Sequence, residues 1–153
     1  MTPRRTIAVA VLTIVAVLAS PFAAEGFTGL LAGNNSTFGH PLGHLLSAVL
    51  TVAVALGIRR LRRASPAPAP DLLSPVRAAG EKQYQLLAFA QWLVLAAAAG
   101  QFLESVGAIT DSANVHNAGL ALTFGAVGIL LFVCLHMLGV GVRGALRPTA
   151  HPS

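Results

Sequence analysis

Residues 38–63 read FGHPLGHLLSAVLTVAVALGIRRLRR. The part from Phe38 to Ile58 contains no Asp, Glu, Lys or Arg. About 20 mostly apolar residues are enough for an α-helix to cross the hydrocarbon core of a bilayer. The run is too long for a barrel strand and lacks the alternation of one, so it predicts a transmembrane helix. A basic cluster follows it at once: Arg59, Arg60, Arg62 and Arg63.

Three further apolar runs resemble this one, at approximately residues 6–27, 83–110 and 114–142. Only 10% of the residues are charged and 55% are hydrophobic, whereas soluble domains carry about 25% charged residues. This composition excludes an ordinary soluble enzyme and a disordered regulator, and the single cysteine excludes an internal disulfide. We therefore expect an all-α integral membrane protein, a four-transmembrane-helix antiparallel bundle. It would form one domain over residues 1–147, with a Pro/Ala-rich linker at 64–70 and a short tail at 148–153.

The basic residues predict the orientation of the bundle. Of the ten, two precede the first run, six lie between the second and third runs, and two follow the fourth. Lys and Arg are enriched in cytoplasmic loops, so we expect both termini in the cytoplasm of a multi-pass protein in a cytoplasmic membrane. Because nearly all of these residues are arginines, we further expect a bacterial source. The positive charges flank apolar runs, which indicates contact with lipid rather than nucleic acid.

Two features of the ends of the runs have alternative interpretations. The basic cluster at 59–63 would either contact anionic lipid headgroups or act only as a topology anchor. Residues 19–24, ASPFAA, follow an arginine pair and an apolar stretch, as in a secretory signal peptide. Cleavage there would leave three spans and would not change the orientation of the rest.

Ionisable side chains within the runs are the candidate functional residues, because such groups are costly at membrane depth. The candidates are His40, His44, Glu104 and His116. His44 comes about one turn into the second run, with Pro41 expected in the first turn of its helix. Glu104 precedes the end of the third run by about 9 Å of helix, and His116 begins the fourth. All four would therefore occupy one layer near the outer surface.

The spacing of these residues indicates that their helices direct polar groups toward one another. His40 and His44 are four residues apart and so share a helix face, which Ser47 and Thr51 continue. On the third run Glu104 shares a face with small residues that allow helices to approach closely. The residues that share this face on the third run are Ala96, Gly100, Glu104 and Gly107. On the fourth run His116, Gly119 and Thr123 line one side of the helix.

Three kinds of chemistry fit such a pocket. Imidazole and carboxylate groups suit a transition metal such as zinc or copper, with His40, His44, Glu104 and His116 as ligands. Alternatively His44 and His116, on diagonal helices, would hold a haem iron between them. Proton or ion handling by His and Glu is a third option. Without any ligand, Glu104 would simply pair with a histidine and join two helices.

No nucleophile–base pair is recognisable, so we expect a non-enzymatic membrane protein. The main alternative to a haem or metal protein is a cofactor-free accessory or assembly subunit, in which Gly100, Gly125 and Gly128 pack against helices of a membrane-protein partner or a second copy. His136 lies about 30 Å along the helix from His116. We expect His136 to pack at a separate helix interface near the cytoplasmic side.

Overall fold

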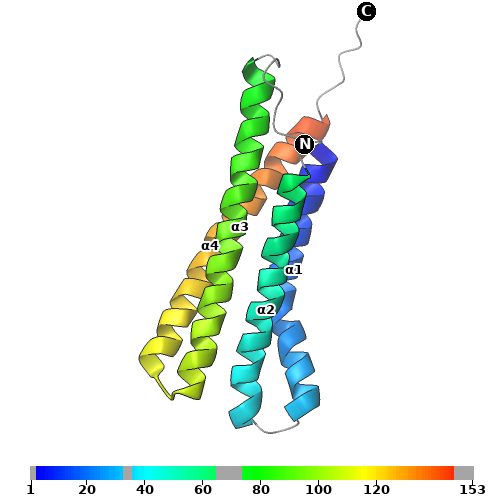
Figure 1. Ribbon diagram of the computed structural model, residues 1–153. Helices are drawn as coiled ribbons and strands as arrows, with labels where there is room; N and C mark the ends of the chain where they lie inside the picture. Colours follow the sequence, from blue (N-terminus) through cyan, green and yellow to red (C-terminus); the bar gives the residue numbers. More distant parts are fainter. Residues whose placement is uncertain (1–2, 33–35, 65–73, 147–153) are drawn as a thin grey trace, which may run out of the picture.

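The computed structural model describes residues 3–32, 36–64 and 74–146, and these residues form four α-helices. They are α1 (Pro3–Ala32), α2 (Ser36–Arg63), α3 (Ser74–Ile109) and α4 (Ala113–Leu146) (Figure 1). The expectation of an all-helical protein with four long apolar helices is therefore confirmed. The expected linker beyond Ala64 and the tail at 148–153 lie outside the described residues.

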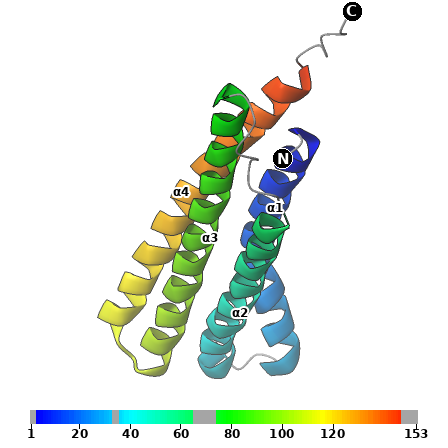
Figure 2. The ribbon, with the colours of Figure 1, turned by 45° about the horizontal axis from the view of Figure 1, so that its top comes forward.

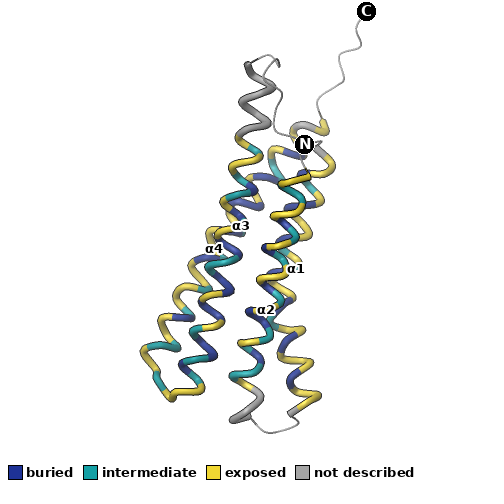
Figure 3. Tube along the Cα trace, viewed as in Figure 1, coloured by how far each residue is buried: buried dark blue, intermediate teal, exposed yellow. Residues whose placement is uncertain are grey.

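Each helix is long and apolar enough to cross a membrane. The qualifying segments are Arg4–Leu31, His40–Arg63, Lys82–Ile109 and Ala113–Arg143. Large apolar side chains cover the outside of the bundle: Phe22, Leu30 and Phe132 are 76%, 86% and 73% exposed. Figure 3 shows exposed residues along the coloured parts of all four helices. Such a surface is stable when hydrocarbon chains surround it, so the protein is consistent with a multi-pass membrane protein.

The helices pack as a ring, each against two others. α1 packs on α2, α2 on α3, α3 on α4, and α4 on α1, so α2 and α4 are diagonal partners. Figures 1 and 2 show the start of α1 and the finish of α4 at the same end of the bundle, called here the terminal end. At the opposite end, called the loop end, α1 stops near the start of α2 and α3 turns into α4.

The two halves of the bundle have different interiors. Toward the terminal end most of the core is an apolar cluster that includes Val9, Ile58, Val94, Leu130 and Met137, with Thr6 and Thr13 of α1 as buried polar residues beside it. Toward the loop end the interior contains several buried polar side chains: Ser20, Thr28, Ser47, Thr51, Gln101, Glu104 and Ser105. Among the described residues, Glu104 is the one charged side chain that is buried. The polar half holds the candidate site, and the apolar cluster separates it from the terminal end.

Two prolines lie inside helices, Pro21 in α1 and Pro41 in α2. The expectation that Pro41 occupies the first turn is wrong, because α2 begins at Ser36. A proline has no N–H and leaves a carbonyl one turn earlier without its helical partner. In α1 the Ser20 hydroxyl donates to the Val17 carbonyl oxygen at 3.0 Å, so a side chain satisfies the oxygen that Pro21 cannot.

Candidate functional site

A short turn between α3 and α4 determines the position of His116. The N–H of Ser112 donates to the Gly107 carbonyl at 2.9 Å, and Asp111 between them has a φ of 52°. This is the Schellman arrangement that ends many helices. The N–H of His116 then donates to the Ser112 carbonyl at 3.0 Å. The turn therefore starts α4 at once and sets His116 directly against Gly107, where an added Cβ would lie 2.7 Å from the His116 Cα.

Glycines then hold α3 and α4 at close range beside Glu104. A Cβ added at Gly119 would lie 2.7 Å from the backbone nitrogen of Glu104 and 2.7 Å from the Gly100 carbonyl oxygen. A Cβ added at Gly100 would lie 2.7 Å from the Thr123 backbone nitrogen. Only residues without a side chain permit this approach, and it brings Thr123 and His116 within hydrogen-bonding distance of Glu104.

Glu104 joins three helices through its own atoms. Its side chain is buried, and its Oε1 accepts a hydrogen bond from the Thr123 hydroxyl at 2.6 Å. Its Oε2 lies 3.1 Å from Nδ1 of His44 on α2. Its backbone carbonyl oxygen lies 3.2 Å from Nδ1 of His116 on α4. Both carboxylate oxygens thus have partners, as a buried carboxylate requires.

The three histidines lie side by side above this carboxylate. Nε2 of His40 and Nε2 of His44 are 3.2 Å apart, within hydrogen-bonding distance, with either nitrogen able to donate according to its tautomer, and the centroids of the two rings are separated by 4.5 Å. The His116 ring centroid lies 6.1 Å from that of His40 and 5.8 Å from that of His44. The structure therefore brings together the four side chains singled out by the sequence. Within the described part of the chain, no three His, Cys, Asp or Glu side chains converge on one ion position as they stand.

A cavity of about 260 Å³ lies beneath the histidines. Its walls come from all four helices and include Phe22, His44, Ser47, Gln101 and Phe124. A second, more open hollow of about 390 Å³ lies at the loop end, where Asp111 and Ser112 line it together with His40 and His116. The histidine cluster is thus reached both from the loop end and from the cavity inside the bundle.

Sequence reasoning missed several polar residues that support the site. Gln101 accepts a hydrogen bond from the Thr51 hydroxyl at 3.0 Å, and Ser20 lies 3.2 Å from the same hydroxyl. Ser105 donates to the Pro41 carbonyl at 2.9 Å and so ties α3 to α2. Gln101 precedes Glu104 by one helical turn, and this spacing was the signal that could have found it.

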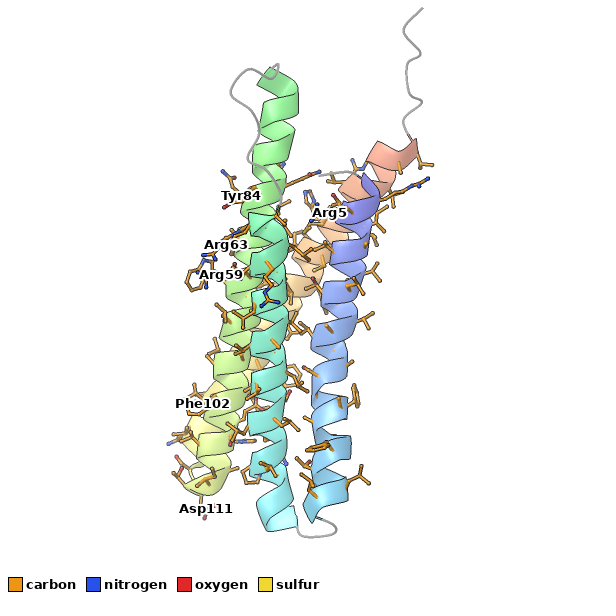
Figure 4. The ribbon with its side chains drawn as sticks, turned by 45° about the vertical axis from the view of Figure 1, so that its right-hand side comes forward. Arg5, Arg59, Arg63, Tyr84, Phe102 and Asp111 are labelled. Atoms are coloured by element: carbon orange, nitrogen blue, oxygen red, sulfur yellow. The ribbon has the colours of Figure 1, made fainter. Side chains whose placement is uncertain are left out.

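The basic cluster forms the last residues of α2 and lies toward the terminal end. Arg59, Arg60 and Arg63 are exposed, whereas Arg62 is half-buried and its guanidinium lies 5.4 Å from the centre of the Tyr84 ring. Figure 4 shows Arg5, Arg59, Arg63 and Tyr84 in this half of the bundle and Asp111 at the loop end. Arg62 therefore packs against α3, and the other three are exposed to the surroundings of the bundle.

Two expectations, one about His136 on α4 and one about Gly100 on α3, are wrong. His136 is exposed on the outside of the bundle and does not pack at an interface between these helices. Gly100 packs against Thr123 of the same chain, so it is not free to contact a partner protein. Gly125 and Gly128 are exposed, with open space around each. These two glycines alone of the expected three remain available to another helix.

No known protein-family model matches the chain, and no curated protein or solved structure is similar to it.

Proposed function

We propose that this chain is a non-enzymatic, multi-pass protein of a bacterial cytoplasmic membrane that binds one transition-metal ion, zinc or copper. The ligands are His40, His44 and His116, each through Nε2, and Glu104 orients two of the rings. The 3.2 Å separation between Nε2 of His40 and Nε2 of His44 carries this proposal. In a tetrahedral site with Zn–N bonds of about 2.0–2.1 Å, two ligand nitrogens stand about 3.3 Å apart.

The distances to His116 support its place as the third ligand. Three imidazoles around one tetrahedral ion have ring centroids about 5 Å apart. The observed centroid distances run from 4.5 Å to 6.1 Å. A small adjustment of the His116 ring toward the other two would complete the set. The hollow at the loop end leaves room for water as a fourth ligand.

The hydrogen bonds at the opposite ring nitrogens support the same proposal. A histidine that binds a metal through Nε2 normally donates its Nδ1–H to a carboxylate or a backbone carbonyl. Nδ1 of His44 lies beside the Glu104 carboxylate, and Nδ1 of His116 lies beside the Glu104 carbonyl oxygen. With the protons on Nδ1, both Nε2 atoms keep the lone pair that a metal needs.

Haem is the second candidate ligand, because His44 and His116 come from diagonal helices with ring centroids 5.8 Å apart. The cavity beneath them measures about 260 Å³, and pockets for drug-sized ligands and cofactors measure about 300–1,000 Å³. α3 and α4 are also in direct contact beside both rings, through Gly100, Gly107 and Gly119. This packing favours a single ion over a porphyrin.

The decisive experiment is a metal titration of the purified protein in mild detergent after removal of metals with a chelator. We expect one Zn²⁺ per chain, and Co²⁺ in its place should give a tetrahedral absorption spectrum. His44→Ala and His116→Ala should abolish this binding, whereas His136→Ala should leave it unchanged, because His136 is exposed elsewhere on α4.

Glu104→Gln tests the orienting role separately. Its side-chain amide can donate to Nδ1 of His44, which would favour the tautomer with the proton on Nε2 and block the metal. We expect a loss of about 10–100-fold in affinity, as for other residues that orient metal-ligating histidines, with the matched variant Glu25→Gln unaffected. Absence of stoichiometric binding by the parent protein would overturn the proposal. A Soret band after expression with haem would replace metal binding by haem binding. If the protein shows neither stoichiometric metal binding nor a Soret band, the accessory-subunit alternative is favoured, with Gly125 and Gly128 facing a partner.

We propose that the bundle is antiparallel with both termini in the cytoplasm. The contacts Gly107–His116 and Gly100–Thr123 support opposite directions for α3 and α4. The basic residues Arg5, Arg59 and Arg63 near the terminal end support a cytoplasmic position of that end, beside anionic headgroups. A fluorescent protein fused after residue 153 should fold and fluoresce, and alkaline phosphatase fused after Asp111 should be active. The reverse pattern would show that the bundle is inverted.

A further inference from the structure

The cavity beneath the histidines has a largely apolar lining, which plays no part in binding a metal ion. Its walls are mostly apolar, with Val17, Leu18 and Phe22 from α1 and Leu120, Phe124 and Val127 from α4. Phe22 and Phe124 are themselves 76% and 70% exposed on the outer surface of the bundle. The cavity therefore borders the surface that contacts hydrocarbon chains, on the side where α1 meets α4.

One buried polar atom in this cavity has no hydrogen-bond partner among the described residues. It is the hydroxyl oxygen of Ser47, a residue that is 2% exposed. Leaving a buried hydroxyl unpaired is unfavourable, and buried polar groups in proteins almost always have a partner. Ser47 lines the cavity beside Gln101. A ligand that presents a hydrogen-bond acceptor at this depth would satisfy the hydroxyl.

The charges in the wall select against anionic ligands. Glu25 and Glu104 line the cavity together with His40 and His44, Glu104 is paired with His44, and no Lys or Arg is among the described lining residues. The carboxylate of a fatty acid or the phosphate of a phospholipid would therefore meet no Lys or Arg there and would be repelled by Glu25. A neutral carbonyl group meets the Ser47 hydroxyl without this repulsion. The two phenylalanines in the wall favour a flat ring next to that carbonyl.

The volume of the cavity agrees with such a ring. An apolar cavity of about 150 Å³ is large enough for benzene, and this one measures about 260 Å³. It is therefore large enough for a substituted six-membered ring, and a longer hydrocarbon chain on that ring would leave between α1 and α4. From the unpaired hydroxyl, the walls without Lys or Arg and the lipid-facing border we propose that this protein binds a neutral, membrane-soluble quinone, with a ring carbonyl hydrogen-bonded to Ser47.

The test uses the full chain in lipid nanodiscs and an azido-substituted quinone with a ten-carbon tail as a photolabel. The buffer contains a chelator, so the outcome does not depend on whether the histidines bind a metal. We expect crosslinks on α1 and α4 at the residues that line the cavity, and unlabelled quinone should compete for them. Decanol, which has the tail without the ring carbonyls, should not compete.

Two variants and one control make the result specific. Leu120→Trp, which fills the cavity, should reduce labelling at least tenfold, whereas Leu122→Trp, on the exposed side of the same helix, should leave it unchanged. Ser47→Ala should weaken binding about two- to tenfold, as expected for one lost hydrogen bond. Labelling spread over the whole lipid-facing surface, equal labelling in Leu120→Trp, or competition by decanol would overturn the proposal.

Discussion

The contact between α3 and α4 at Gly119 gives the sharpest prediction. The Cβ of an alanine at this position would lie 2.7 Å from the Glu104 nitrogen and from the Gly100 carbonyl oxygen. Because non-bonded carbon atoms prefer about 3.5–4.0 Å, α4 would have to move away by roughly 1 Å. Both atoms that block the Cβ belong to helix backbone, so no side-chain rotation can relieve the contact. Overpacking of this kind costs about 1–3 kcal/mol.

Gly125 supplies the matched control on the same helix. An alanine there meets nothing within 4 Å, so Gly125→Ala reports only the intrinsic preference of the helix for alanine over glycine, about 1 kcal/mol. The difference in unfolding free energy between Gly119→Ala and Gly125→Ala therefore isolates the steric cost. We expect Gly119→Ala to be the less stable variant by about 1–3 kcal/mol. The assay is reversible unfolding in mixed micelles with increasing dodecyl sulfate, followed by far-ultraviolet circular dichroism.

The same displacement should reach the candidate metal site. His116 Nδ1 lies 3.2 Å from the Glu104 carbonyl oxygen, and a shift of roughly 1 Å in α4 would break this hydrogen bond. Gly119→Ala should therefore also weaken Zn²⁺ binding, whereas Gly125→Ala should not. Equal unfolding midpoints for the two variants would refute the close approach of α3 and α4.

Paired substitutions at three further positions test two contacts and one backbone conformation with the same unfolding assay. Thr123→Val removes the hydroxyl that donates to the buried Glu104 carboxylate and should lower the unfolding free energy by about 1.5–3 kcal/mol. Thr123→Ser keeps a hydroxyl and should keep most of that stability. Equal losses in the two variants would contradict the hydrogen bond. Asp111 has a φ of 52°, a conformation that glycine adopts freely and valine does not. Asp111→Gly should therefore be neutral or stabilising, and Asp111→Val should lower the unfolding free energy by about 1–2 kcal/mol. A valine variant as stable as the glycine variant would disprove the left-handed turn. Tyr84→Leu removes the ring that lies against the Arg62 guanidinium and should lower the unfolding free energy by about 0.5–1 kcal/mol. Tyr84→Phe keeps the ring and should keep this stability. A loss of the same size in Tyr84→Phe would show that the ring face is not responsible.

The number and position of the helices were predictable because they depend on local properties of the chain. A run of apolar residues long enough to cross a bilayer is recognisable without knowledge of its neighbours. The shared face of His40 and His44 was equally local, since any α-helix brings residues four apart together. Pro41 was less informative, because the apolar segment begins at His40 whereas the helix that contains it already begins at Ser36, so Pro41 lies beyond the first turn.

The support of the site was less predictable, because it depends on how each helix is rotated about its axis. Gln101, Ser105 and Ser20 carry no motif, and their roles follow from which helix faces them. The same holds for His136, which was expected inside and lies outside. In a soluble helix the apolar stripe indicates the buried face. Here lipid and core are both apolar, so hydrophobicity does not distinguish them.

The sequence by itself determined four membrane-length helices and the presence of four ionisable side chains in one layer of the bundle, because span length and helical periodicity are local. Only the tertiary structure decided that Glu104 serves two histidines at once, one through its carboxylate and one through its backbone carbonyl. It also decided that Gly100, Gly107 and Gly119 bring α3 and α4 into backbone contact, while Gly125 and Gly128 remain on the outside. The physical reason is that rotation and separation of the helices depend on close packing between particular backbones, which the apolar character of a span does not encode.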